Sequence, residues 1–474
     1  MSRRWATGFH DRKDFLVAPT TRDACLLPSG ADFIRRDPAL PGLATLLDSG
    51  ALVCGLCRSL GRSDLRLEQV TYVKYKPGAF CRAGYRLQIA GTPIDLYATT
   101  YGPDGERELR WARYHLGVPE ALGVGRVVLE QCAAVVSFFP NDRKIKRLRA
   151  WAEPAARKKV LRDLLPGRPD LWKGAVESLA YKPERRYVAR LCGNGGVDAV
   201  LKVFSRKQYP AVRATAGAFA PRGILWLPRL LGSSDRHAAL AFEWLPGRVL
   251  SEALADPQFE PAALSDVGRA LAQLHAQEPR GLPHRPPGAE ATALGRVAEA
   301  FASLYPPLAG RVREAARRLG ADLADGPPVS RALHGDFNTT QVLLADGRVA
   351  FLDCDRALWG DPAFDLGNFL AHLEREALAS HAPATRVQAA GESLLEGYGS
   401  GSDLQLRRRV QRYTAAMLFE GLNPLRYWRP SGRGPDVMAC WLPHWPELAE
   451  ALLGRVEGLL GAAGACSRGA EGCR

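Results

Sequence analysis

This chain carries the sequence Leu333-His-Gly-Asp336-Phe-Asn-Thr-Thr-Gln341-Val-Leu-Leu344, followed by Phe351-Leu-Asp353-Cys-Asp355 and Gly360-Asp-Pro-Ala-Phe-Asp365-Leu. Asp336 lies in a short loop, Gln341 precedes an apolar strand, and Asp353 follows the strand that returns. A hydroxyl that attacks a γ-phosphoryl group needs a base for its proton and a cation that neutralises the nucleotide charge. Asp336 can be that base, and the side-chain oxygens of Gln341 and Asp353 are ligands that Mg²⁺ favours. The spacing therefore predicts phosphoryl transfer.

Each of these residues also has an ordinary structural interpretation. An isolated aspartate is often a turn former or a helix cap, Gln341 could be an exposed polar residue, and Asp353 could simply end a strand. The ordered set favours the functional interpretation. We expect Asp361 and Asp365 to brace loops, and His334 to be a hydrogen-bonded loop residue rather than a base.

The composition is that of a soluble globular protein with two or three structural units. The chain has 474 residues, of which 46% are hydrophobic and 24% are charged, and this length exceeds one ordinary core. The formal net charge of +14 suits an enzyme that attracts a polyanionic nucleotide. Because Lys and Arg are spread over the whole chain without a nucleic-acid-binding motif, we expect no specific nucleic-acid partner.

The cysteines and the N-terminal residues indicate the compartment. Ten cysteines include one close pair, Cys54 and Cys57, and no second pair at zinc-finger spacing, so reduced thiols are expected. The N-terminal residues lack an apolar signal core, and no run of about 18 apolar residues occurs. We therefore expect a cytoplasmic protein with no membrane attachment.

An internal repeat is visible in the sequence. The tripeptide Tyr75–Pro77 recurs as Tyr181–Pro183, and the segment Ala133–Pro140 has a counterpart in Ala239–Pro246, both offset by 106 residues (75 to 181, 140 to 246). This register over a whole subdomain indicates duplication. Chance similarity between two β-rich segments is the alternative, since each match is short.

The pattern of strands and helices divides the chain. In the second copy we expect strands at 176–181, 187–191 and 199–204, with the Gly-rich stretch 193–196 as a hairpin turn rather than a phosphate loop. After Pro246 apolar residues follow helical spacing. The predicted units are an N-terminal segment without an interpretable motif (1–64), a degenerate N-lobe-like copy (65–150), a basic linker helix (151–175), a nucleotide-binding N-lobe (176–248) and a helical catalytic C-lobe (249–474).

The motif resembles that of the aminoglycoside phosphotransferase and choline kinase-like family, whose pattern is His-Gly-Asp, four residues, Asn, and a hydrophobic hairpin that ends in Asp. The likeness extends to Phe242–Gly247, which resembles the family's hinge, and to Ala270–His275 in the following helix. It covers roughly residues 176 to 460. The resemblance implies an α+β, protein-kinase-like two-lobed fold with a β-rich N-lobe and a helical C-lobe, here preceded by the degenerate copy.

The resemblance also implies site residues and cofactors. Lys202 would contact the phosphates of ATP, and the backbone near Glu243 to Leu245 would contact adenine. Asp336 would be the catalytic base, and Gln341 and Asp353 would bind Mg²⁺. The cofactors that the resemblance implies are therefore ATP and Mg²⁺.

The chain departs from the family pattern in two places. Gln341 replaces the usual Asn, as in maltokinases, which it also resembles in having an extra N-terminal unit. No acidic residue lies between Lys202 and Asp235, so the usual acidic partner of the lysine is missing. The first copy has Glu108 in the corresponding stretch but Thr99 in place of the lysine, so we infer that it cannot hold nucleotide by itself. Glu108 could serve Lys202 across the copies.

These features favour a small-molecule kinase that uses ATP and Mg²⁺ to phosphorylate a hydroxyl of a sugar or an amino-containing metabolite. Acidic residues beyond His372 alternate with arginines, and aromatic residues that could stack on sugar rings tilt the expectation toward a sugar: Tyr427, Trp428, Trp441 and Trp445. The alternative is a pseudokinase or scaffold that binds nucleotide and a protein partner. The sequence leaves the oligomeric state open.

Overall fold

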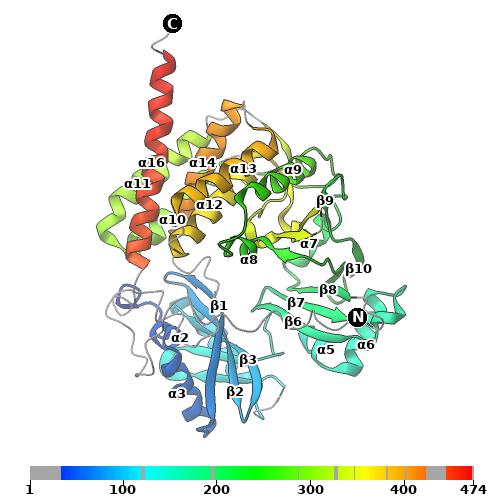
Figure 1. The fold of residues 1–474 in the computed structure, drawn as a ribbon. Helices are drawn as coiled ribbons and strands as arrows, with labels where there is room; N and C mark the ends of the chain where they lie inside the picture. Colours follow the sequence, from blue (N-terminus) through cyan, green and yellow to red (C-terminus); the bar gives the residue numbers. More distant parts are fainter. Residues whose placement is uncertain are drawn as a thin grey trace.

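The computed structural model describes residues 34–118, 123–193, 198–286, 288–324, 329–345, 347–380, 383–400, 403–422 and 445–471. Most of the predicted hairpin turn at 193–196 lies outside these residues, as do Tyr427, Trp428, Trp441 and the side chain of Trp445. Two five-stranded sheets lie side by side and a helical lobe lies beside them (Figure 1). We call them the first lobe (34–140), the second lobe (141–247) and the helical lobe (248–471).

The first sheet has the strand order β1-β2-β3-β5-β4. Two helices precede it and one helix follows β3. These elements are α2 (Leu43–Leu47), α3 (Ser49–Leu60), β1 (Leu65–Lys76), β2 (Phe80–Ile89), β3 (Thr92–Tyr101), α4 (Glu106–Tyr114), β4 (Arg126–Leu129) and β5 (Ala134–Phe138).

The second sheet repeats this connectivity, because its order is β6-β7-β8-β11-β10 when read from the first strand. Two helices again precede the sheet and one follows its third strand. The elements are α5 (Leu148–Ala152), α6 (Pro154–Leu164), β6 (Ala175–Lys182), β7 (Arg186–Cys192), β8 (Asp198–Phe204), α7 (Tyr209–Thr215), β10 (Leu230–Ser234) and β11 (Ala239–Glu243). The internal repeat is therefore confirmed at the level of topology.

The register equates individual residues of the two lobes. Thr99 pairs with Arg82 on β2 and with Val135 on β5. In the second lobe Lys202 pairs with Val188 and with Leu240 at the matching positions. Thr99 is thus the counterpart of Lys202, as the sequence predicted.

The helices before each sheet belong to the lobes. In the segment predicted as a basic linker helix, residues 151–175, Trp151, Val160, Leu161 and Leu164 are buried against the second sheet. The basic residues of α6 suggested a solvated linker helix, but its apolar stripe packs on the strands of the second sheet. In the same way α2 and α3, within the predicted segment 1–64, pack on the first sheet.

The helical lobe surrounds two small sheets that carry the loop motif. α9 buries Leu264, Val267, Leu271 and Leu274, as their spacing predicted. One sheet contains β12 (Arg248–Val249), β14 (Val342–Ala345) and β15 (Arg348–Phe351) and is extended by β9 (Leu225–Trp226) of the second lobe; the other contains β13 (Arg331–Leu333) and β16 (Leu358–Gly360). The α-helices are α8 (Leu250–Leu254), α9 (Leu264–His275), α10 (Ala289–Leu304), α11 (Ala309–Ala324), α12 (Ala363–Ser380), α13 (Ala384–Tyr398), α14 (Leu404–Glu420) and α16 (Trp445–Glu471).

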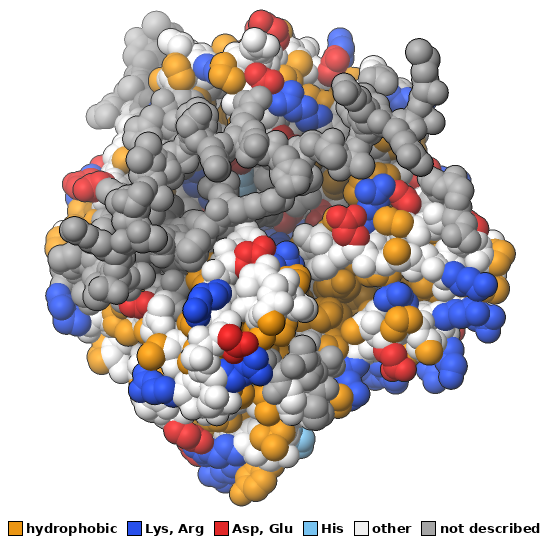
Figure 2. Space-filling model, turned by 60° about the horizontal axis from the view of Figure 1, so that its bottom comes forward, with side chains coloured by type: hydrophobic (Ala, Val, Ile, Leu, Met, Phe, Trp, Pro, Cys, Tyr) orange, Lys and Arg blue, Asp and Glu red, His pale blue; other side chains and the backbone are white. Residues whose placement is uncertain are grey.

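The fold is thus α+β, with two β-rich lobes and one helical lobe. Among the helices in the described part of the chain, none combines the length and apolar character that a membrane span needs. On the face shown in Figure 2, Lys and Arg side chains occur in separate places with acidic side chains among them.

Candidate active site

The loop after β13 is held by one buried aspartate. The carboxylate of Asp365 accepts the backbone N–H of His334 at 2.7 Å and that of Gly335 at 3.0 Å, and its Oδ2 lies 3.1 Å from Nε2 of His275. Burial alone would raise the pKa of Asp365, but the hydrogen bond from His275 holds it below the ordinary value. Asp365 therefore braces the loop, as the sequence suggested.

His334 is a loop residue in the structure. Its Nε2 lies 2.7 Å from the carbonyl oxygen of Leu352, and its Nδ1 accepts the backbone N–H of Asp336 at 3.3 Å. Both ring nitrogens are thus used within the loop, and the imidazole is buried. This geometry leaves the base role to another group.

Asp336 has its backbone fixed from both sides. Its N–H is donated to His334, and its carbonyl oxygen accepts Nδ2 of Asn338 at 2.8 Å. Its side chain is half-buried, and among the described residues its carboxylate has no hydrogen bond or ion pair. A carboxylate that is held in place and unpaired can accept a proton from a hydroxyl.

Gln341 and Asp353 lie at the base of one hairpin. β14 and β15 pair Val342 with Phe351, and the carbonyl oxygen of Gln341 accepts the N–H of Leu352 at 2.8 Å. Asp353 follows with φ of +60°, a left-handed conformation that costs a non-glycine residue about 1–3 kcal/mol and is often found at functional sites. The hairpin therefore brings the two predicted metal ligands to the same end.

Two cations from the second lobe bind two carboxylates of the helical lobe. Nζ of Lys202 lies 2.5 Å from Oδ1 of Asp353 and 2.8 Å from Oδ1 of Asp355. Arg186 contacts the other oxygen of each carboxylate at 2.9 Å. Burial opposes charge on these groups, but the mutual attraction lowers the pKa of Asp353 and raises that of Lys202. Lys202 and Asp353 are therefore both charged.

These contacts answer the question of the missing acidic partner. Lys202 is balanced by Asp353 and Asp355 rather than by a residue of α7. The expectation that Glu108 could serve Lys202 is wrong, because Glu108 accepts Nη1 of Arg143 at 3.3 Å instead. Arg186 and Asp355 were missed from the sequence. Their signals were the position of Arg186 at the first residue after the β6–β7 loop (183–185) and the close spacing of the two aspartates.

The predicted hinge connects the second lobe to the helical lobe. Glu243 ends β11, and its carboxylate accepts a hydrogen bond from Nε of Arg229 at 3.0 Å. Its side chain therefore pairs with Arg229 and not with Lys202 or Arg186. Leu245 is buried in a small cluster with Leu343 and Ala350. Its backbone groups make no hydrogen bond within the described part of the chain, which leaves them available to a planar heterocycle.

The donor set suits a divalent cation only in part. The described residues contain no group of three or more His, Cys, Asp or Glu side chains that could hold a metal ion. Mg²⁺ usually takes one or two carboxylates and completes its shell with water and phosphate oxygens. The oxygens of Asp353, Asp355 and Gln341 fit that requirement, provided that Lys202 and Arg186 exchange their carboxylates for phosphates.

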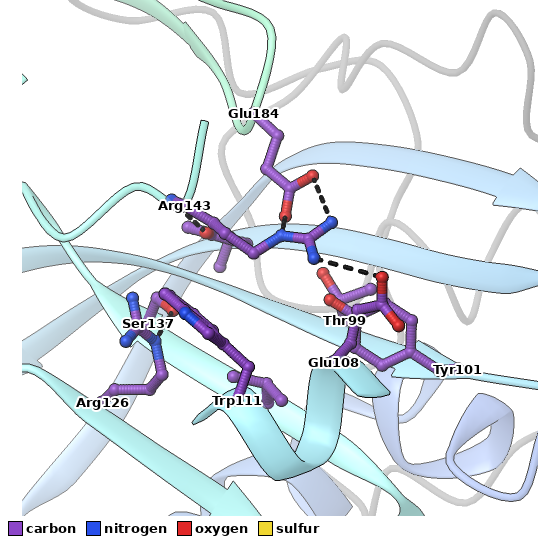
Figure 3. Close-up of a pocket in the computed structure, with 10 residues that line it drawn as sticks. Thr99, Tyr101, Glu108, Trp111, Arg126, Ser137, Arg143 and Glu184 are labelled. Atoms are coloured by element: carbon purple, nitrogen blue, oxygen red, sulfur yellow. Dashed lines mark hydrogen bonds and ion pairs between the residues drawn. The ribbon is translucent and has the colours of Figure 1, made fainter. Parts of the chain in front are cut away.

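The comparable place in the first lobe is closed. Oγ1 of Thr99 accepts Nε of Arg82 at 2.9 Å, and Nη2 of Arg82 lies 3.0 Å from the carboxylate of Glu184, which comes from the second lobe. Only a cavity of about 10 Å³ remains there, which is room for about one water molecule. Figure 3 shows side chains that line this cavity, among them Glu108, Arg143 and Glu184.

Comparison with known proteins gives a family match for about half of the chain. Residues 184–411 match the family described as "Phosphotransferase enzyme family". Curated protein sequences gave no match.

Several solved structures resemble the chain. A thermostable mutant of aminoglycoside phosphotransferase APH(4)-Ia, in a ternary complex with ADP and hygromycin B, is 18% identical, covers 61% of this chain and 94% of its own, and has a TM-score of 0.41. A choline/ethanolamine kinase family protein from Mesorhizobium loti is 17% identical over 66% of this chain and 97% of its own, with a TM-score of 0.44. Macrolide 2'-phosphotransferase MphH from Brachybacterium faecium is 25% identical over 52% and 84%, with a TM-score of 0.37.

Proposed function

Because residues 184–411 match the family described as "Phosphotransferase enzyme family", we propose that this protein transfers the γ-phosphate of ATP to a hydroxyl group of a small molecule. The observation that carries the proposal is the contact between Lys202 of the second lobe and Asp353 of the helical lobe, in a protein whose Asp336 carboxylate is unpaired. A cation for phosphates, a metal ligand and a base are the parts that phosphoryl transfer requires.

The residues have distinct proposed roles. Asp336 accepts the proton of the attacking hydroxyl, and its fixed backbone holds the carboxylate in place for that step. Lys202 and Arg186 bind phosphate oxygens and so neutralise the charge of the nucleotide. Asp353 and Gln341 would hold Mg²⁺, which supplies further charge neutralisation when bound. The backbone of Glu243 to Leu245 receives the adenine ring.

In the absence of nucleotide, the two cations and two aspartates neutralise each other. Phosphate oxygens of ATP would replace the carboxylates around Lys202 and Arg186, and Asp353 and Asp355 would then be available to hold Mg²⁺. The exchange keeps every charge paired, which avoids the cost of a buried lone charge. It supports a resting state in which the protein's own charges neutralise one another until a polyanion binds.

The surroundings of the acidic residues favour an uncharged acceptor. Glu374 is bound by Arg455 at 2.7 Å, and Glu392 by Arg407 at 2.8 Å. Glu376 accepts the hydroxyl of Thr339 at 2.8 Å, next to the loop of the proposed base. Since these carboxylates are already engaged, they offer little attraction to a polycation, and we favour a sugar hydroxyl over an amino-containing metabolite as the acceptor.

ATP turnover with a panel of sugars and amino alcohols tests the proposal. Asp336→Ala should lower kcat about 10²-fold or more, because general-base catalysis contributes about that much. Asp104→Ala, an exposed aspartate of the first lobe, is the matched control and should leave kcat unchanged. Measurement of ADP release and of the phosphorylated product gives the rates.

The alternative is a pseudokinase or scaffold. One observation favours it, since both oxygens of Asp353 are occupied by cations of the protein. Unchanged turnover in Asp336→Ala, or nucleotide binding without any product across the panel, would support this alternative and contradict the proposed mechanism.

A further inference from the structure

The β6–β7 loop carries a costly residue at its centre. Glu184 has φ of +60°, and its counterpart in the first lobe, Gly78, has φ of +68°. Glycine adopts this conformation without an energetic penalty, whereas for a glutamate the conformation costs free energy. The two turns are otherwise built alike, because an aspartate accepts the N–H of each residue: Asp37 at 2.9 Å and Asp142 at 2.7 Å. The backbone of the turn therefore does not require a glutamate. The reason for a glutamate at position 184 must lie in its side chain.

That side chain is buried where the two β-rich lobes meet, between Arg82 of the first lobe and Arg143 and Lys144 at the start of the second. The carboxylate of Glu184 is 1% exposed and lies 3.0 Å from Arg82, 3.0 Å from Arg143 and 2.8 Å from Lys144. Burial raises the pKa of Glu184, but the cations outweigh burial and lower it, so the carboxylate is charged. Figure 3 shows Arg143 between Glu184 and Glu108. We call Glu184, Arg82, Arg143 and Lys144 the inter-lobe cluster.

The first lobe is in turn fixed to the helical lobe. Nη1 of Arg36 donates to the carbonyl oxygen of Leu304 at the end of α10, at 2.9 Å, and its guanidinium lies over the ring of Tyr305. The apolar core of the first sheet is continuous with that of the helical lobe, whereas the second sheet has a separate core. The first lobe thus provides a rigid point to which a loop of the second lobe is attached.

The same loop leads directly into the active site. Arg186 is two residues after Glu184, and it contacts Asp353 and Asp355. One end of this short segment is therefore bound to the first lobe, while the other end bears a cation of the proposed phosphate site. Displacement of Glu184 would move Arg186.

We propose that the first lobe is an anchor for the β6–β7 loop, and that Glu184 is a positioning residue that holds Arg186 where the nucleotide phosphates bind. This inference rests on the proposed function for its kinetic consequence, though not for its structural one. It assigns a role to the duplicated lobe, in which Thr99 stands at the position of Lys202. The position in the first lobe that corresponds to the phosphate site instead binds the β6–β7 loop of the second lobe, through Arg82 and Glu184.

The test is Glu184→Gly, which keeps the left-handed turn and removes the anchor. We expect the amides of residues 184–186 to exchange hydrogen about tenfold faster or more, and the KM for ATP to rise about tenfold with a much smaller change in kcat. Glu177→Gln is the matched control, because Glu177 lies on β6 with an exposed side chain, and it should change neither quantity. Partial unfolding would instead lower the apparent kcat, because it reduces the amount of active enzyme, and would leave the KM of the folded fraction unchanged.

A second variant covers the case in which Glu184→Gly does not fold. Arg143 is a quarter exposed and supplies two hydrogen bonds to Glu184, so Arg143→Met should shift exchange and KM in the same direction by about threefold. Wild-type exchange and KM in a folded Glu184→Gly would overturn the proposal. If the wild type shows no ATP turnover, the proposed function fails, and the exchange measurement still decides whether the anchor exists.

Discussion

The two β-rich lobes have the same strand order but different buried charges. In the second lobe a lysine on the third strand meets aspartates of the helical lobe, whereas in the first lobe an arginine on the second strand meets a glutamate of the second lobe. The register places both cations at the same level of their sheets, since Arg82 pairs with Thr99 as Val188 pairs with Lys202. A single scaffold can therefore serve as a reaction site or as an anchor, depending on which segment supplies the carboxylate.

The largest expected effect concerns the second lobe. Lys202→Met removes one of two cations from the proposed phosphate site, and removal of one electrostatic stabiliser costs about 10²- to 10³-fold in kcat. Lys207→Met changes an exposed lysine beyond the same strand and should have no effect. Steady-state kinetics with circular dichroism measure the two variants. A loss of less than tenfold for Lys202→Met would mean that Arg186 alone serves the phosphates.

The corresponding change in the first lobe should affect stability more than catalysis at saturating ATP. Arg82→Met removes a buried cation from the inter-lobe cluster, and breaking a buried ion pair costs about 3 kcal/mol. Urea unfolding measures this loss. Arg113→Met, in an exposed pair with Glu130, should cost much less. Equal losses in the two variants would show that the cluster is not a distinctive feature of the interface.

The smallest effect is a pH dependence that arises from the excess of cations at this interface. Burial, and then the nearby Arg185 and Arg82, lower the pKa of Lys74 to about 8 from 10.5. Between these pH values the unfolded chain binds more protons at this site than the folded chain, so stability should rise with pH. After allowance for partial exposure, wild type should gain about 1 kcal/mol over Lys74→Met between pH 8 and pH 10. A flat difference would contradict the assignment.

The sequence predicted the parts of the fold that depend on local pattern. The recurrence of Tyr75–Pro77 at Tyr181–Pro183 identified the repeat, because in each lobe the tyrosine hydroxyl and the turn share one aspartate. The loop around Asp336 and the hairpin that ends at Asp353 were also recognisable. Asp336 lies on a short loop and Asp353 ends the hairpin that follows it. Their separation along the chain therefore determines how far apart they lie in the structure.

The rest depends on contacts between residues that are far apart. Arg186 meets Asp355 across 169 positions, and no periodicity links them. Glu184 was unremarkable in the sequence, because only the positive φ and the three surrounding cations distinguish it from an exposed turn residue. The burial of α6 was missed for a similar reason, since its exposed basic residues, such as Lys159 and Arg162, stand out in the sequence more than its short apolar stripe.

The order of these ion pairs along the chain bears on how the protein is made. In both lobes the carboxylates are encoded after the cations that they neutralise: Glu184 follows Arg82 and Arg143, and Asp353 and Asp355 follow Arg186 and Lys202. A chain growing from the ribosome therefore presents each sheet before the charges that complete it. The first lobe can close only after the β6–β7 loop has emerged, and the second only after the hairpin, so the order of synthesis becomes the order of assembly.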